Sequence, residues 1–114
     1  MYYNYKDGIS IRSVLDKRIY RKSGLYPIRI CVTYKRIMKY YSTEKELSIE
    51  DWERLASTRL KNLTILREDV MNRFNLISKI VEELADIGEF SFDNLKKQIL
   101  DTISPSRNID KLEN

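Results

Sequence analysis

The sequence contains no histidine and only one cysteine, Cys31. Without histidine the chain cannot assemble Ser–His or Cys–His nucleophiles, imidazole acid–base chemistry or histidine-ligated zinc from its own residues. A single cysteine forms neither an internal disulfide nor a cysteine metal cluster, which is typical of a protein from a reducing compartment. The sequence therefore excludes these kinds of catalytic and metal site, and we predict no metal and no cofactor.

Glycine and long apolar runs are also scarce. Three glycines, Gly8, Gly24 and Gly88, are too few and too scattered to build a phosphate-binding loop. The N-terminus lacks the apolar run of a signal peptide, and no stretch approaches the ~18 apolar residues of a membrane span. With 114 residues, 42% apolar and 33% charged, the chain has the composition of one globular domain. We expect it in the cytoplasm and not in a membrane.

The net charge of +4 conceals an uneven distribution along the chain. Residues 1–45 carry eleven Lys and Arg against three acids, whereas the remaining residues carry ten against fourteen. A strongly basic first half joined to a mildly acidic second half is typical of a module that presents one end to a polyanion.

Alternating apolar and polar residues predict a three-stranded antiparallel meander. Residues 9–15 and 26–34 alternate with period two, which is the spacing of a strand with one buried face. Residues 37–43 follow a tight Lys35-Arg36 turn and complete the meander. We expect the buried face to consist of the branched apolar side chains of the first two strands, which are Ile9, Ile11, Ile28, Ile30 and Val32.

After the third strand the apolar period becomes helical. Ser48 stands before acids of a first helical turn and predicts a short helix that carries Trp52 and ends near Ser57. A long amphipathic helix is predicted next, ending at Gly88, with apolar residues at steps of three and four: Leu63, Leu66, Val70, Phe74, Ile77, Val81, Leu84 and Ile87. Ser91 predicts the cap of a last helix.

The predicted fold class is therefore α+β, a three-stranded antiparallel β-meander backed by helices, with a long C-terminal amphipathic helix. We divide the chain into four parts. These are a flexible N-terminus (1–8), a basic sheet with a short helix (9–57), a helical extension (58–103), and a linker or chain end (104–114).

Helices on one side of such a sheet leave its other face open. We expect this face to carry Arg12, Arg29 and Thr33, whose positions on strands suit them to contact base edges. A ribbon of this width fits the ~12 Å major groove of double-stranded DNA, which is the partner that we predict. The candidates for phosphate contacts are the basic residues of the loops and turns: Lys17, Arg18, Arg21, Lys22, Lys35, Arg36 and Lys39.

Two other functions stay open. The long amphipathic helix is also typical of a protein-interaction module, in which it packs against a second copy or a neighbouring domain. A basic sheet also suits an RNA-binding module, in which exposed aromatic side chains stack on bases. Tyrosines in a small sheet more often pack in the core or at its edge, and we expect this for Tyr26, Tyr34, Tyr40 and Tyr41. Cys31 is expected to face outward as an unreactive filler.

Several short motifs stand in a characteristic order between residues 9 and 100. They are Ile11-Arg12-Ser13-Val14-Leu15, a basic loop that ends at Gly24, Tyr26-Pro27-Ile28-Arg29-Ile30-Cys31-Val32-Thr33-Tyr34, Lys39-Tyr40-Tyr41-Ser42-Thr43, Trp52-Glu53 and Phe90-Ser91-Phe92. This order resembles the N-terminal arm DNA-binding domain of Bacteroidetes tyrosine recombinases, the phage- and transposon-type integrases. One departure is Glu44, which stands where that family usually has glycine after the Ser-Thr pair.

The resemblance implies a sheet that enters the major groove at repeated arm sites beside the attachment site. It also implies that catalysis belongs to a separate C-terminal domain with a histidine-containing constellation, reached through a core-binding domain. A chain without histidine then binds DNA without cutting it. Its expected partners are double-stranded DNA and its own core-binding and catalytic domains, with a homo-oligomer through the long helix as a further possibility, all in a bacterial cytoplasm.

Overall fold

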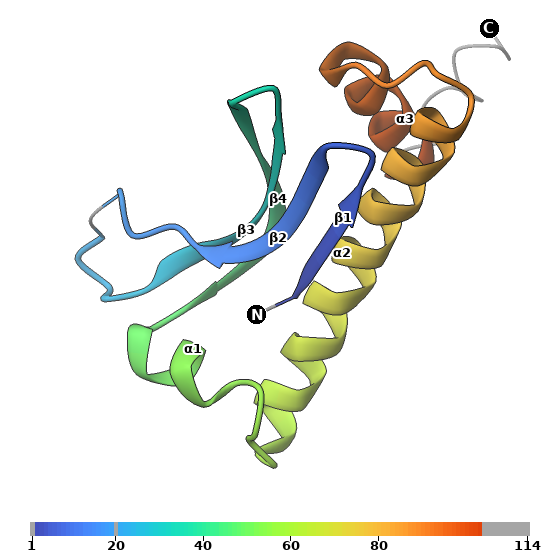
Figure 1. Ribbon diagram of the computed structural model, residues 1–114. Coiled ribbons are helices and arrows are strands. Elements are labelled where there is room, and N and C mark those ends of the chain that lie inside the picture. The colour runs from blue at the N-terminus through green and yellow to red at the C-terminus, as the bar shows by residue number, and fades with distance from the viewer. Residues whose placement is uncertain (1, 20, 104–114) are drawn as a thin grey trace, which may run out of the picture.

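The computed structural model describes residues 2–19 and 21–103. It has the predicted α+β class, with a four-stranded antiparallel sheet and three helices (Figure 1). In both chain and sheet the strands run in the order β1 (Tyr3–Lys6), β2 (Ile9–Leu15), β3 (Tyr26–Tyr34) and β4 (Ile37–Leu47). The helices α1 (Ile49–Arg54), α2 (Lys61–Asp86) and α3 (Phe92–Ile103) follow. None of the helices in these residues is long and apolar enough to cross a membrane.

The sheet has one strand more than expected, because part of the predicted flexible N-terminus is β1. This strand pairs with β2 through a two-residue turn, Asp7-Gly8, with φ angles of 49° and 83°. Positive φ at both positions is the backbone conformation that a type I′ hairpin requires. Two side chains of β1 also contact α2: the Asn4 amide donates to Glu82 at 2.8 Å, and Lys6 lies 2.8 Å from Asp86.

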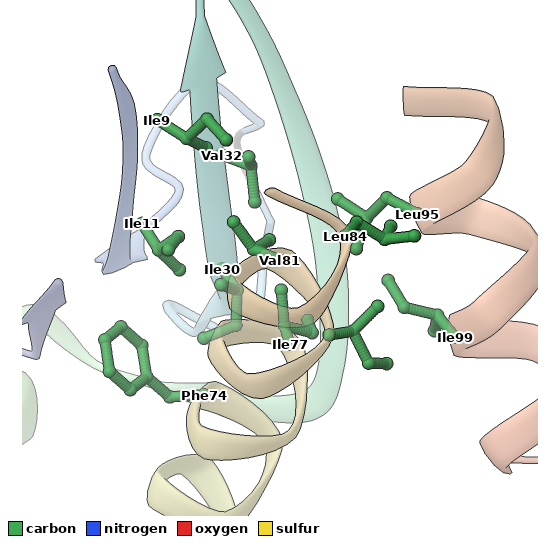
Figure 2. Close-up of a cluster of buried hydrophobic side chains, with 11 residues drawn as sticks. Ile9, Ile11, Ile30, Val32, Phe74, Ile77, Val81, Leu84, Leu95 and Ile99 are labelled. Carbon is green, nitrogen blue, oxygen red and sulfur yellow. The ribbon is translucent and has the colours of Figure 1, made fainter. Parts of the chain in front are cut away.

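The face predicted to be buried forms the core. Ile9, Ile11, Ile28, Ile30 and Val32 are all buried there. Figure 2 shows four of them directed at α2, where Phe74, Ile77 and Val81 receive them, while Leu95 and Ile99 of α3 lie beyond Leu84. A second apolar cluster fills the other end of the sheet and includes Leu55, which directly follows α1. The helices therefore lie on one side of the sheet, called the inner face below.

Three predicted helix ends are confirmed in the structure. The Ser48 hydroxyl accepts from the Asp51 amide at 3.1 Å, and the Ser91 hydroxyl accepts from the Asn94 amide at 3.0 Å. Gly88 has φ 71° directly after α2, and the next amide donates to the Leu84 carbonyl at 2.8 Å. This is the left-handed glycine ending expected from the sequence, and it reverses the chain so that α3 packs on α2.

A β-bulge interrupts β4. The pairing with β3 shifts between Ile28 and Arg29, whose partners are Lys45 and Ser42, and the extra residues are Thr43 and Glu44. Glu44 has φ 63°, in the left-handed region that glycine adopts without steric cost. This explains in physical terms why glycine suits the position after the Ser-Thr pair.

Replacing Glu44 with glycine is expected to stabilise the domain. The left-handed conformation costs a residue with a side chain about 1–2 kcal/mol, and the greater flexibility of unfolded glycine offsets part of the gain. We expect Glu44→Gly to raise the free energy of unfolding by about 0.5–1 kcal/mol, measured by urea denaturation. Glu44→Ala is the matched control, since it removes the charge but keeps the strain. An equal gain in both variants would show that charge, not backbone strain, is responsible.

Candidate nucleic-acid interface

The face of the sheet opposite the helices is called the outer face. Its side chains are fixed by the strand register, which places Tyr3, Arg12, Cys31 and Tyr40 in one row across the four strands. A second row contains Val14, Arg29 and Ser42, and a third contains Tyr5, Ser10, Thr33 and Met38. The outer face thus carries two arginines on its central strands.

The three residues predicted to contact bases all lie on the outer face. Arg12 is exposed at the middle of β2, and Thr33 is half-buried on β3. Arg29 is also on β3, in the row next to that of Arg12, and 28% of its side chain is exposed. The structure therefore brings this predicted set together on adjacent strands, within one surface.

The cations predicted to contact phosphate occupy three separate places. Lys17, Arg18, Arg21 and Lys22 lie in the loop between β2 and β3, at one end of the sheet, where Arg21 pairs with Glu46. Lys35 and Arg36 form the exposed two-residue turn at the opposite end, with φ angles of 50° and 70°.

Lys39 does not join the outer face. Its partner in the register is the inward-facing Val32, and its ammonium lies 6.0 Å from the ring centroid of Phe92 on α3. The apolar pattern of this strand does not decide its orientation, because Met38 and Tyr40 compete with Ile37 and Tyr41 for the buried face. The structure settles it: Tyr41 faces the core, so Lys39 shares its side.

A buried carboxylate lies among these cations. The Asp16 side chain, directly after β2, is only 1% exposed. Its Oδ1 accepts from the Arg18 backbone amide at 3.2 Å and from Arg18 Nε at 2.8 Å, and its Oδ2 accepts from Arg18 Nη2 at 2.8 Å. Arg29 Nη1 lies 3.2 Å from the same Oδ2. The Arg18 hydrogen bonds, with a smaller contribution from the charge of Arg29, lower the pKa of Asp16 to about 2.

Arg18 also covers an aromatic ring. Its guanidinium carbon lies 4.1 Å from the centroid of Tyr40, in cation–π geometry. A surface hollow of about 410 Å³ lies at this place, lined by Arg12, Val14, Leu15, Asp16, Lys17, Arg18 and Tyr40. Cys31 faces outward as expected, yet it is fully buried in the register between Arg12 and Tyr40.

The tyrosines divide between the two faces. Tyr26, Tyr34 and Tyr41 pack against the core as predicted, and burial raises the pKa of Tyr41 to about 12. Tyr40 lies instead on the outer face of the edge strand β4, where Arg18 packs on its ring. Tyr3 and Tyr5 are exposed on the outer face as well, although residues 1–8 show no periodic pattern that would predict a strand there.

A sheet packed on helices by one face, with arginines and tyrosines on the other, defines a small module for binding a polyanion. A family model described as "Arm DNA-binding domain" matches residues 13–96, more than two thirds of the chain. The chain therefore belongs to the arm DNA-binding domain family, as the resemblance predicted. It is a DNA-binding module of the integrase type. No curated protein and no solved structure matches it.

The pH dependence of stability is expected to reveal the buried carboxylate. Because the pKa of Asp16 in the folded protein, about 2, lies below its ordinary value of 3.8, its contribution is present above about pH 4. That contribution is lost as the pH falls from 4 to 2. We therefore expect the wild type to be more stable than Asp16→Asn at pH 5, with the difference shrinking toward pH 2 in urea denaturation.

Asp69→Asn is the control for this comparison. Asp69 is a half-exposed carboxylate, 3.2 Å from Lys45 on the inner side of the sheet. The substitution therefore removes the same charge from a solvated ion pair. We expect a much smaller difference from the wild type at pH 5. A stability difference for Asp16→Asn that stays constant down to pH 2 would contradict the assignment.

Proposed function

We propose that the outer face of the sheet enters the major groove of double-stranded DNA. The observation that carries the proposal is the open outer face, with Arg12 and Arg29 on its central strands and a cationic loop at its end. Arg12 and Arg29 suit the acceptor atoms of guanine in the groove, and the Thr33 hydroxyl and methyl suit other base edges. The loop cations hold the domain on the phosphates.

The width of the sheet supports this docking. Three strands, β2 to β4, span two spacings of ~4.8 Å, or about 10 Å between their outer backbones, which is compatible with a groove ~12 Å wide. The additional strand β1 extends this width past the groove, so it falls on the rim. There the hydroxyls of the exposed Tyr3 and Tyr5 can donate hydrogen bonds to phosphate oxygens.

Loop charge favours phosphate binding at the sheet end. In the part of the chain that the structure describes, Lys17 and Lys22 form no ion pair, whereas Arg21 is held by Glu46. Unpaired lysines release counterions when they meet DNA and bring no requirement for base sequence. We assign Lys17 and Lys22 to affinity, with Lys35 and Arg36 in the same role at the other end.

Within a recombinase, this domain is proposed to act as a tether. By occupying arm sites it raises the effective concentration of core-binding and catalytic domains at the crossover site, and it lets one recombinase bridge two duplex segments. This role places the chain with DNA in the bacterial cytoplasm. The resemblance to tyrosine recombinases and the arm-domain family support it.

Single-stranded nucleic acid, RNA included, is a second candidate ligand. It is favoured by one observation, the exposure of Tyr3 and Tyr5 on the same face of β1, because exposed aromatic rings are stacking platforms for unpaired bases. Oligomerisation through the long helix stays a prediction: the buried residues of α2 pack against the sheet and α3, so a second copy would have to contact its exposed side.

Binding to DNA is expected to weaken steeply with salt. If about five phosphates are neutralised, log K falls with log[salt] at a slope of about −4.5, or several-hundred-fold between 50 and 200 mM. Fluorescence anisotropy with a labelled random 24-base-pair duplex measures this slope. A single-stranded oligonucleotide of the same length is the competitor. Tighter binding of the single strand, or salt-insensitive binding, would reject the major-groove proposal.

Substitutions on the two faces are expected to act differently. Arg12→Ala should reduce the preference for a duplex selected from a random library, by roughly 5- to 100-fold for a bidentate base contact. Lys22→Ala should weaken binding to all duplexes alike and reduce the salt slope by about one. Lys79→Ala, on the exposed side of α2, is the matched control and should change neither. Loss of affinity in Lys79→Ala equal to that in Lys22→Ala would reject the face assignment.

A further inference from the structure

Asp16 places a buried negative charge directly beneath the cations of the outer face. A carboxylate at this point repels the phosphate backbone and lowers the affinity for every duplex. Its side chain is 1% exposed and bonds to two arginines from different segments, Arg18 in the loop and Arg29 on β3. Asp16 therefore weakens the attraction of the outer face to DNA, although it contacts two of the residues proposed to bind DNA. Its presence at this place has to be explained by something other than affinity for the phosphate backbone.

The Arg29 guanidinium contacts Asp16 through one nitrogen, and the rest of the side chain is partly exposed. Its Nη1 lies 3.2 Å from Asp16 Oδ2, while 28% of its side chain remains exposed. A guanidinium has five N–H donors in a rigid plane. The ion pair with Asp16 therefore restrains one end of this plane and leaves donors for a ligand on the outer face.

Arg18 is held more completely. Two of its nitrogens donate to the two carboxylate oxygens, its backbone amide donates to Oδ1, and its guanidinium lies on the Tyr40 ring. Nevertheless, 60% of its side chain is exposed. The loop residue is thereby drawn back over the sheet, into the row that contains Arg12.

We propose that Asp16 is a positioning residue for DNA recognition, which holds the guanidinium planes of Arg18 and Arg29 in fixed orientations and so raises selectivity for base sequence while lowering nonspecific affinity. The inference rests on the proposed function, in which the outer face binds DNA. Base edges accept a guanidinium fork in one orientation, whereas phosphates accept it in many. Fixing the fork therefore favours discrimination between bases.

The test uses the full 114-residue chain and a duplex library randomised over 12 base pairs. Wild-type protein first enriches a preferred duplex, and anisotropy then gives the ratio of the Kd for the library to the Kd for that duplex. In Asp16→Asn we expect the ratio to fall about tenfold, while binding to the library stays equal or tightens up to about twofold. Opposite changes for the two probes separate positioning from misfolding, which would weaken both.

Asp69→Asn is the matched control, because it removes the same charge from the inner side of the sheet. It should leave the ratio unchanged. If Asp16→Asn keeps the wild-type ratio, or if Asp69→Asn lowers it equally, the positioning role is overturned. If the wild type enriches no sequence at all, the failure belongs to the proposed function.

Arg18→Lys provides a second variant in case Asp16→Asn does not fold. Lysine keeps the charge but lacks the planar fork that bridges the carboxylate and the ring. Because lysine loses the two guanidinium hydrogen bonds to a buried carboxylate but keeps the charge, this variant should lose part of the Asp16 contribution to stability and still fold, which a melting curve checks. We expect a severalfold lower ratio with an unchanged salt slope, and a folded Arg18→Lys with the wild-type ratio would overturn the role of the Asp16–Arg18 pair.

Discussion

The packing of β2 and β3 on α2 is the constraint on which the outer face depends. Ile11, Ile30 and Val32 are completely buried against this helix. Because successive side chains of a strand point to opposite faces, burying these three commits their neighbours to the other side. A shift of one residue would place arginines in the core, so hydrophobic burial alone fixes which residues can meet a ligand.

The same alternation explains how much of the structure could be predicted. The face of β2 and β3, and the ends of the helices at Ser48, Gly88 and Ser91, follow from local patterns with strong physical causes. Strand β1 did not, although Asp7-Gly8 is a strong hairpin signal, because its inward residues are Asn4 and Lys6. Their partners lie on α2, almost eighty residues away, and such contacts leave no local pattern.

The candidate site shows a similar division. The positions of Arg12, Arg29 and Thr33 on one face followed from period two, and their role in binding stays a prediction. The role of Asp16 could not be read from composition, since an acid near basic residues usually belongs to a solvated surface. Only the register indicates the contact on which the proposed role depends, by placing the residue after Val14 and Leu15 near Arg29 on the neighbouring strand. The spacing of two residues between Asp16 and Arg18 was the one local feature of the sequence that could have indicated their contact.

Backbone strain at the end of the β3–β4 hairpin fits the proposed division between affinity and selectivity. Lys35 and Arg36 both have positive φ, where Asn-Gly would stand with little strain, so each costs about 1–2 kcal/mol. The pairing of eleven-residue β4 with β3 on one side and the packing of Tyr34 on Phe90 on the other oblige the chain to reverse in two residues. Two long cations at this turn therefore lower stability, and the cation–π contact of the Lys35 ammonium, 5.3 Å from the Tyr34 ring centroid, offsets only part of this cost. In the proposed complex, a phosphate backbone at the sheet end supplies further contacts without requiring oriented side chains, whereas Asp16 orients the arginines nearer the groove floor.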